Sequence, residues 1–139
     1  MEKAEIQALI REAFAAQKFA YVPYSHFHVG AALRGKNGQV FRGCNIENAS
    51  YTPTNCAERT ALFKAVSEGV REFDAIAIVG SKVGETNPLV PGPCGVCRQA
   101  LYEFGGPELT VIMARSEDDY IVTTLGDLLP YGFGPANLE

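Results

Sequence analysis

The sequence contains two short runs that decide the fold and its chemistry, N-C-A-E-R-T at residues 55–60 and P-C-G-V-C-R-Q at residues 93–99. Together they hold three of the four cysteines, and each run follows a loop and opens a helix-like segment. Cys94 and Cys97 are spaced i and i+3, so on a helix both sulfurs point to one side of its first turn. Cys56 lies at the start of the other helix. If the two helix starts face each other, three thiolates can bind one metal ion and leave its fourth position open, which is the layout of a catalytic zinc site.

Two charged side chains beside Cys56 suit such a site. Glu58 follows in the first helical turn, where a carboxylate that is not itself a ligand can accept a proton from water and pass it to a substrate. Three thiolates around Zn²⁺ leave a net negative charge, which should raise the pKa of Glu58. Arg59 and the two helix N-termini can offset that charge.

The rest of the chain shows helical and strand periodicities in alternation. The expected elements are an amphipathic helix over 3–19, a hairpin of strands 27–33 and 39–44 around Asn37-Gly38, a helix over 56–68 capped by Thr54 or Asn55, a strand over 75–79, a long loop over 80–93, a helix over 94–104, strands over 109–113 and 120–123, and a short helix over 125–129. This order predicts one domain over residues 1–139 with an α/β fold, a three-layer α/β/α sandwich around a mixed sheet of about five strands.

The composition excludes several classes of protein. With 139 residues, 47% of them hydrophobic, the chain can bury a core, while a net charge of −4 argues against a nucleic-acid-binding surface. No apolar run approaches the ~20 residues needed to cross a membrane, and the charged start lacks a signal-peptide pattern. We therefore expect a cytoplasmic protein, in which cysteines serve a metal site rather than disulfides.

Other interpretations of these residues remain open on their types alone. Cys44 could add a fourth thiolate and make the centre a closed structural zinc site, or it could be a buried strand residue. The pair Cys94 and Cys97 could serve redox chemistry, although that leaves Cys56 and Glu58 unexplained. His26 and His28 share one face without a partner, and we take them as structural.

The two cysteine runs resemble those of the zinc-dependent cytidine deaminases. The resemblance covers nearly the whole chain, including Y-S-H-F-H-V-G-A-A-L at 24–33, G-C-N-I-E-N-A at 43–49, L-P at 129–130 and F-G-P at 133–135. These segments are similar to the small homotetrameric branch of the family, which uses three cysteines. In zinc deaminases, zinc-bound hydroxide attacks C4 of cytosine and a glutamate that is not a ligand shuttles protons.

The resemblance implies a role for each matching residue. Cys56, Cys94 and Cys97 would bind one Zn²⁺ per chain, Glu58 would be the catalytic proton shuttle, and Arg59 would hydrogen-bond the ligand sulfurs. Phe27 would pack against the base, and Ala57, with Glu58, would contact the base edge. The residues implied for the sugar are Asn45 and Glu47, and those implied to complete the pocket of a neighbouring subunit are Ala49, Tyr51 and Phe133.

The function implied is the hydrolytic deamination of cytidine and 2′-deoxycytidine to uridine and 2′-deoxyuridine with release of ammonia, a step of pyrimidine salvage. The implied partners are a small nucleoside substrate and three further copies of the chain in a homotetramer, without nucleic acid or membrane. Two alternatives are a relative that acts on another amino-heterocycle, such as a blasticidin-type antibiotic, and a structural zinc-binding module.

Overall fold

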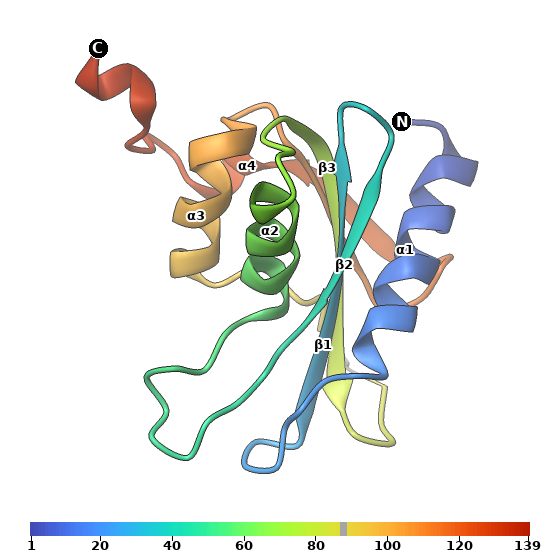
Figure 1. The fold of residues 1–139 in the computed structure, drawn as a ribbon. Helices are drawn as coiled ribbons and strands as arrows, with labels where there is room; N and C mark the ends of the chain where they lie inside the picture. The colour runs from blue at the N-terminus through green and yellow to red at the C-terminus, as the bar shows by residue number, and fades with distance from the viewer. Residues whose placement is uncertain (87–88) are drawn as a thin grey trace.

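The computed structural model of the chain describes residues 1–86 and 89–139. Its central element is a mixed five-stranded sheet in the order β2-β1-β3-β4-β5, in which β3 and β4 are parallel and the other neighbours are antiparallel (Figure 1). The elements in chain order are α1 (Lys3–Gln17), β1 (Phe27–Gly35), β2 (Val40–Cys44), α2 (Ala57–Ser67), β3 (Phe73–Lys82), α3 (Gly95–Gly105), β4 (Thr110–Ala114), β5 (Tyr120–Thr124), α4 (Leu125–Leu128) and a 3₁₀ helix (Pro135–Leu138).

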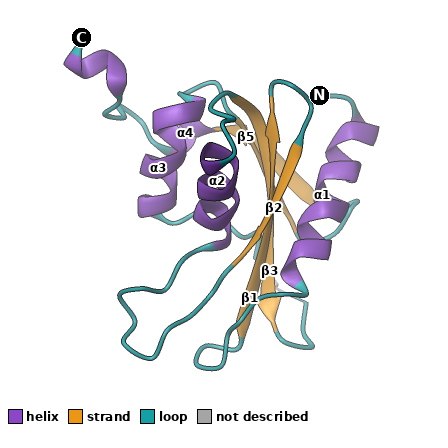
Figure 2. Cartoon of the chain, in the orientation of Figure 1, coloured by secondary structure: helices purple, strands orange, loops and turns teal. Residues whose placement is uncertain are grey.

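Helices cover both faces of the sheet. Helix α1 lies on one face and α2 and α3 lie side by side on the other, as Figures 1 and 2 show. Strand β3 serves both layers because its side chains alternate: Ile76 and Ile78 join the core beneath α2 and α3, whereas Ala77 and Val79 join the core beneath α1. The expected three-layer α/β/α sandwich around a mixed five-stranded sheet is confirmed.

The parallel pairing of β3 and β4 places the starts of α2 and α3 together. Helix α2 leads into β3, and α3 connects β3 to β4 as a crossover. Both helices therefore begin at the end of the sheet where β3 and β4 finish, which is the usual place for sites in open α/β folds. Long loops surround this end (Figure 2).

Two glycines let the helices pack directly on the strand backbones. A Cβ atom added to Gly30 of β1 would lie 2.0 Å from the carbonyl oxygen of Ala13 in α1, and one added to Gly43 of β2 would lie 2.3 Å from the carbonyl oxygen of Ala57 in α2. Neither position can accept a side chain without moving backbone. The contact at Gly43 also fixes the first turn of α2.

The structure corrects several expected boundaries. The N-cap of α2 is Cys56, not Thr54 or Asn55. Strand β3 runs to Lys82 rather than ending at Val79, because its pairing with β1 continues to Phe27 and overrides the glycine signal at position 80. The expected 80–93 loop is shorter as a result, and residues 87–88 of it lie outside the described residues. Smaller shifts are that α1 ends at Gln17 rather than Phe19, β1 extends to Gly35, β4 begins at Thr110 rather than Leu109, and α4 ends at Leu128.

No helix among residues 1–86 and 89–139 combines the length and the apolar character that crossing a bilayer requires.

We predict that Gly30→Ala lowers the free energy of unfolding by about 1–3 kcal/mol or more, because the new methyl group must push α1 away from β1. Urea unfolding followed by circular dichroism measures the change. The matched control is Gly95→Ala, where the added Cβ would meet no heavy atom within 4 Å. Equal stability of Gly30→Ala and Gly95→Ala would show that the helix does not depend on this close approach.

Candidate active site

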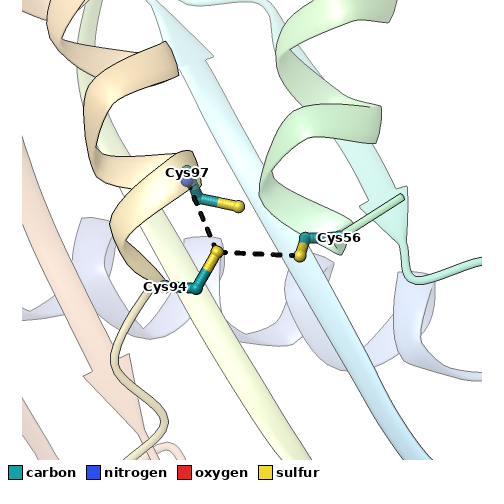
Figure 3. Close-up of side chains that lie close together, drawn as sticks. All are labelled: Cys56, Cys94 and Cys97. Carbon is teal, nitrogen blue, oxygen red and sulfur yellow. Dashed lines mark hydrogen bonds between the residues drawn. The ribbon is translucent and has the colours of Figure 1, made fainter. Parts of the chain in front are cut away.

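Three cysteine side chains converge from the facing starts of α2 and α3. Cys56 is the N-cap of α2, Cys94 is the N-cap of α3, and Cys97 lies in the first turn of α3. Their sulfur atoms all lie within 4.8 Å of one another, and the Sγ atoms of Cys56 and Cys94 are 3.9 Å apart (Figure 3). The backbone N–H of Cys97 donates to the Cys94 sulfur at 3.5 Å. Helix N-termini favour thiolates at these positions, as the sequence suggested.

The geometry of the three sulfurs fits zinc. A tetrahedral zinc ion with Zn–S bonds of about 2.3 Å holds its sulfur ligands roughly 3.8 Å apart, close to the separation of Cys56 and Cys94. A disulfide would instead need about 2.05 Å between sulfurs. In the part of the chain that the structure describes, the cluster consists of these three cysteines, without Cys44 or Glu58. A zinc ion held by this cluster would have three cysteine ligands and keep one position open. Because Cys44 lies outside the cluster, the closed four-cysteine alternative is wrong.

The thiol groups cannot all ionise without a cation. The pKa of Cys56 is lowered to about 5, first by a hydrogen bond from the Cys97 thiol and then by Arg59, whose guanidinium donates to the Cys56 sulfur at 3.3 Å. The pKa of Cys97 is raised, because its thiol donates to Cys56 and is also buried. The Cys56 thiolate is thus stabilised by the protonated Cys97 thiol. A bound divalent metal ion would supply the positive charge that allows both groups to bind as thiolates.

Glu58 lies buried beside this cluster, with only 4% of its surface exposed. Its pKa is raised to about 7, first by burial and next by the negative charge of Cys56, while its own backbone N–H and Arg59 act in the opposite direction. The expected direction of the shift is present, but its main cause is desolvation rather than the thiolates. A carboxyl group with a pKa near neutrality can both accept and donate a proton.

A cavity of about 250 Å³ opens onto Glu58 and two of the cysteines. Three of the residues expected at the substrate, Phe27, Asn45 and Ala57, line it. The other lining residues are Val29, Ile78, Pro91 and Gly92. None of these four carries a functional signal in its residue type, because Val29 and Ile78 match the apolar pattern of core strands and the other two match a loop.

The side chain of Asn45 ties the loop after β2 to β1. Its Oδ1 accepts the backbone N–H of Val29 at 2.8 Å, and its Nδ2 donates to the carbonyl oxygen of Phe27 at 2.9 Å. The asparagine is therefore held firmly at the cavity wall by the strand that carries Phe27.

The remaining expected substrate residues do not reach this cavity within one chain. Glu47 and Tyr51 line a second hollow of about 430 Å³, together with Tyr24, Ser25 and Thr54. Ala49 is exposed in the loop between β2 and α2. Phe133 lies in the tail that projects from the body of the molecule (Figure 1), and its side chain is 56% exposed.

Cys44 and the two histidines lie outside the cavity. Cys44 ends β2, is half-buried, and has a pKa raised by burial. His28 contacts the Ser81 hydroxyl through Nε2 at 3.3 Å. His26 is in the loop before β1, with a backbone φ of +58°.

We predict that Cys94→Ala weakens zinc binding by more than about 100-fold, because even the loss of an outer hydrogen-bond partner of a zinc ligand costs about 10- to 100-fold. Zinc competition with a chromogenic chelator measures the affinity. Cys44→Ala is the matched control and should keep one zinc per chain. Loss of zinc from the Cys44 variant, or its retention by the Cys94 variant, would contradict the three-cysteine centre.

Comparison with known proteins agrees with this geometry. Residues 3–113 match the family model for the cytidine and deoxycytidylate deaminase zinc-binding region. A cytidine deaminase of Sporosarcina psychrophila is 46% identical over 135 residues, which cover 97% of this chain and 96% of that protein. A cytidine deaminase of Halalkalibacterium halodurans is 53% identical over 127 residues, covering 91% and 92%.

A solved structure of another cytidine deaminase has a similar fold. A crystal structure of a cytidine deaminase from Burkholderia pseudomallei superposes with a TM-score of 0.83 at 52% sequence identity, covering 91% of this chain and 97% of that one. On its sequence, its fold and its zinc-binding region, the chain belongs to the cytidine and deoxycytidylate deaminase family.

Proposed function

We propose that the protein is a zinc-dependent cytidine deaminase, which hydrolyses cytidine and 2′-deoxycytidine to uridine and 2′-deoxyuridine and releases ammonia. The observation that carries this proposal is one cavity lined by the buried carboxyl group of Glu58 and by Cys56 and Cys94 of the three-cysteine cluster. A zinc ion bound by the cluster would keep one open position for water. A redox pair or a structural zinc module would need neither the open position nor Glu58. The names of the relatives support the same substrate class.

The chemistry divides between the metal and Glu58. Zinc held by Cys56, Cys94 and Cys97 would supply Lewis-acid activation of the water that reacts at C4 of the base. Glu58, with a pKa of about 7, would take one proton from that water and deliver it to N3 of the ring. It would then take the remaining proton from the hydroxyl group formed at C4 and give it to the amino group, which leaves as ammonia. Arg59 would steady the thiolate charge of Cys56 through its hydrogen bond.

The cavity wall supplies recognition. We propose that Phe27 packs against the cytosine ring, that the backbone at Ala57 and Glu58 contacts the base edge, and that Asn45 hydrogen-bonds a sugar hydroxyl. These four residues line the cavity of the same chain. Glu47, the second proposed sugar contact, lines the second hollow instead.

We propose that four copies of the chain share their pockets. Ala49, Tyr51 and Phe133 would complete the site of a neighbouring subunit. Tyr51 is 73% exposed and Phe133 56% exposed, and neither lines the chain's own cavity. Large aromatic side chains in such positions suit contacts between subunits.

We also propose the domain organisation, the cellular location and the metabolic role. A single domain over residues 1–139 would act on free nucleosides in the cytoplasm, as a step of pyrimidine salvage. Four free cysteines and a negative net charge support a reducing location and a small-molecule substrate rather than a nucleic acid.

We predict that Glu58→Gln lowers kcat for cytidine by about 10²- to 10⁴-fold while the protein keeps one zinc per chain, because the amide cannot transfer protons. Loss of ultraviolet absorbance on conversion to uridine follows the reaction. Glu103→Gln, an exposed carboxylate on α3, is the control and should be as active as the parent protein. If the zinc-loaded parent turned over neither cytidine nor 2′-deoxycytidine, the substrate assignment would be wrong, and blasticidin-type antibiotics would be assayed next.

We further predict that inactive subunits complement each other if pockets are shared. Glu58→Gln and Tyr51→Ala chains, each of low activity, should regain part of the parental rate after they are mixed and reassembled, because some hybrid sites then contain both native residues. Light scattering should give a mass about four times the 15.0 kDa of one chain. A monomeric mass, or mixtures no more active than their components, would contradict the shared pocket.

A further inference from the structure

The hydroxyl group of Ser25 connects the second hollow to the cavity at the three-cysteine cluster. It donates to Oε2 of Glu47 in the second hollow, and it accepts the backbone N–H of Phe27, which lines the first, at 3.0 Å. Oε1 of Glu47 also accepts the backbone N–H groups of Tyr24 and Ser25, at 3.0 and 3.1 Å. One carboxylate and one hydroxyl thus bind three backbone N–H groups where the chain enters β1, those of Tyr24, Ser25 and Phe27.

These hydrogen bonds stabilise a loop whose next residue, His26, has an unfavourable backbone conformation. His26 has a φ of +58°, in the left-handed region that a residue with a Cβ rarely adopts. Hydrogen bonds on both sides compensate: Ser25 is held by Glu47, and the carbonyl oxygen of His26 accepts the N–H of Val83 at 2.9 Å. Such conformations persist where the surrounding contacts determine them.

The position of the Phe27 ring is restricted by strand β3. A Cβ atom added to Gly80 of β3 would lie 3.0 Å from Cε1 of Phe27, so the ring packs against the glycine backbone. Phe27 is also the first paired residue of β1, opposite Lys82. Its backbone N–H, by contrast, has Ser25 as its partner, and this bond sets the angle at which the chain enters the strand.

We infer that Ser25 is a positioning residue for the deaminase reaction. It links Glu47 in the second hollow to Phe27, whose ring lies in the substrate cavity. The hydroxyl donates to the Glu47 carboxylate and accepts the backbone N–H of Phe27, so it couples the position of the carboxylate to the backbone that carries the aromatic ring. Alanine breaks both bonds, whereas threonine keeps a hydroxyl at the same atom. This inference rests on the proposed function, in which Phe27 faces the base.

The kinetic test compares Ser25→Ala, Ser25→Thr and the control Ser67→Ala, whose hydroxyl bonds to the Lys64 carbonyl oxygen at the far end of α2. Ser25→Ala should raise KM for cytidine by roughly tenfold and change kcat less than twofold, the size expected for lost hydrogen bonds that include a charged partner. Ser25→Thr should restore the parental KM. An unchanged KM in Ser25→Ala, or a loss of kcat that threonine does not rescue, would overturn the inference.

A double-mutant cycle identifies the route by which Ser25 acts. If it acts through the aromatic ring, Ser25→Ala should have no further effect on KM in a Phe27→Leu background. The effect should also persist with 2′,3′-dideoxycytidine, which keeps the 5′-hydroxyl but lacks the 2′- and 3′-hydroxyls. An effect confined to substrates with 2′- or 3′-hydroxyls, or additive to Phe27→Leu, would show that Ser25 does not act through the ring.

A measurement without substrate separates this inference from the proposed function. Amide hydrogen exchange of Phe27, followed by NMR on the zinc-loaded protein, should be about tenfold faster in Ser25→Ala than in the parent or in Ser25→Thr, since the acceptor of that N–H is gone. If the parent protein fails to deaminate cytidine while this exchange effect is present, the proposed function fails and the structural link stands. Unchanged exchange would refute the link itself.

Discussion

The site depends on two helices that begin beside each other at one end of the sheet. The parallel pairing of β3 and β4, with α3 as the crossover between them, brings Cys94 and Cys97 to the place where Cys56 starts α2. Three sulfurs then lie within 4.8 Å across two separate segments of the chain. Because the helix N-termini favour negative charge, the fold also prepares these cysteines to bind as thiolates.

Burial gives the neighbouring carboxyl group its reactivity. Glu58 has almost no exposed surface, and desolvation raises its pKa to about 7, so it can exchange protons near neutral pH. The arrangement depends on the core beneath it. A Cβ atom added to Gly43 would lie 2.3 Å from the carbonyl oxygen of Ala57 and 2.9 Å from the Cβ of Ala61, so the first turn of α2, and hence Glu58, lies close against the backbone of β2.

The residues proposed for substrate recognition are spread over more of the molecule than those proposed for catalysis. The residues proposed to meet the base line the cavity of one chain, whereas Glu47 and Tyr51 line a separate hollow. The short loop from Tyr24 to Phe27 lies between the two hollows, and its hydrogen bonds to Glu47 make them parts of one structure. We therefore expect a shift of the Glu47 carboxylate in the second hollow to change the position of Phe27 at the cavity wall.

The sequence by itself determined the local features. The Asn37-Gly38 turn, the helices that follow the two cysteine runs and the buried strands follow from spacing and residue type, which act over a few neighbours. The family resemblance added the choice of three cysteines as ligands and the expected roles of Glu58 and of the substrate residues. Tertiary structure alone decided which groups meet: it excluded Cys44 from the cluster, brought Val29 and Ile78 to the cavity, and separated Glu47 from it. It also extended β3 to Lys82 and made burial the main cause of the Glu58 pKa shift, because strand pairing and desolvation arise from contacts between residues far apart in the chain.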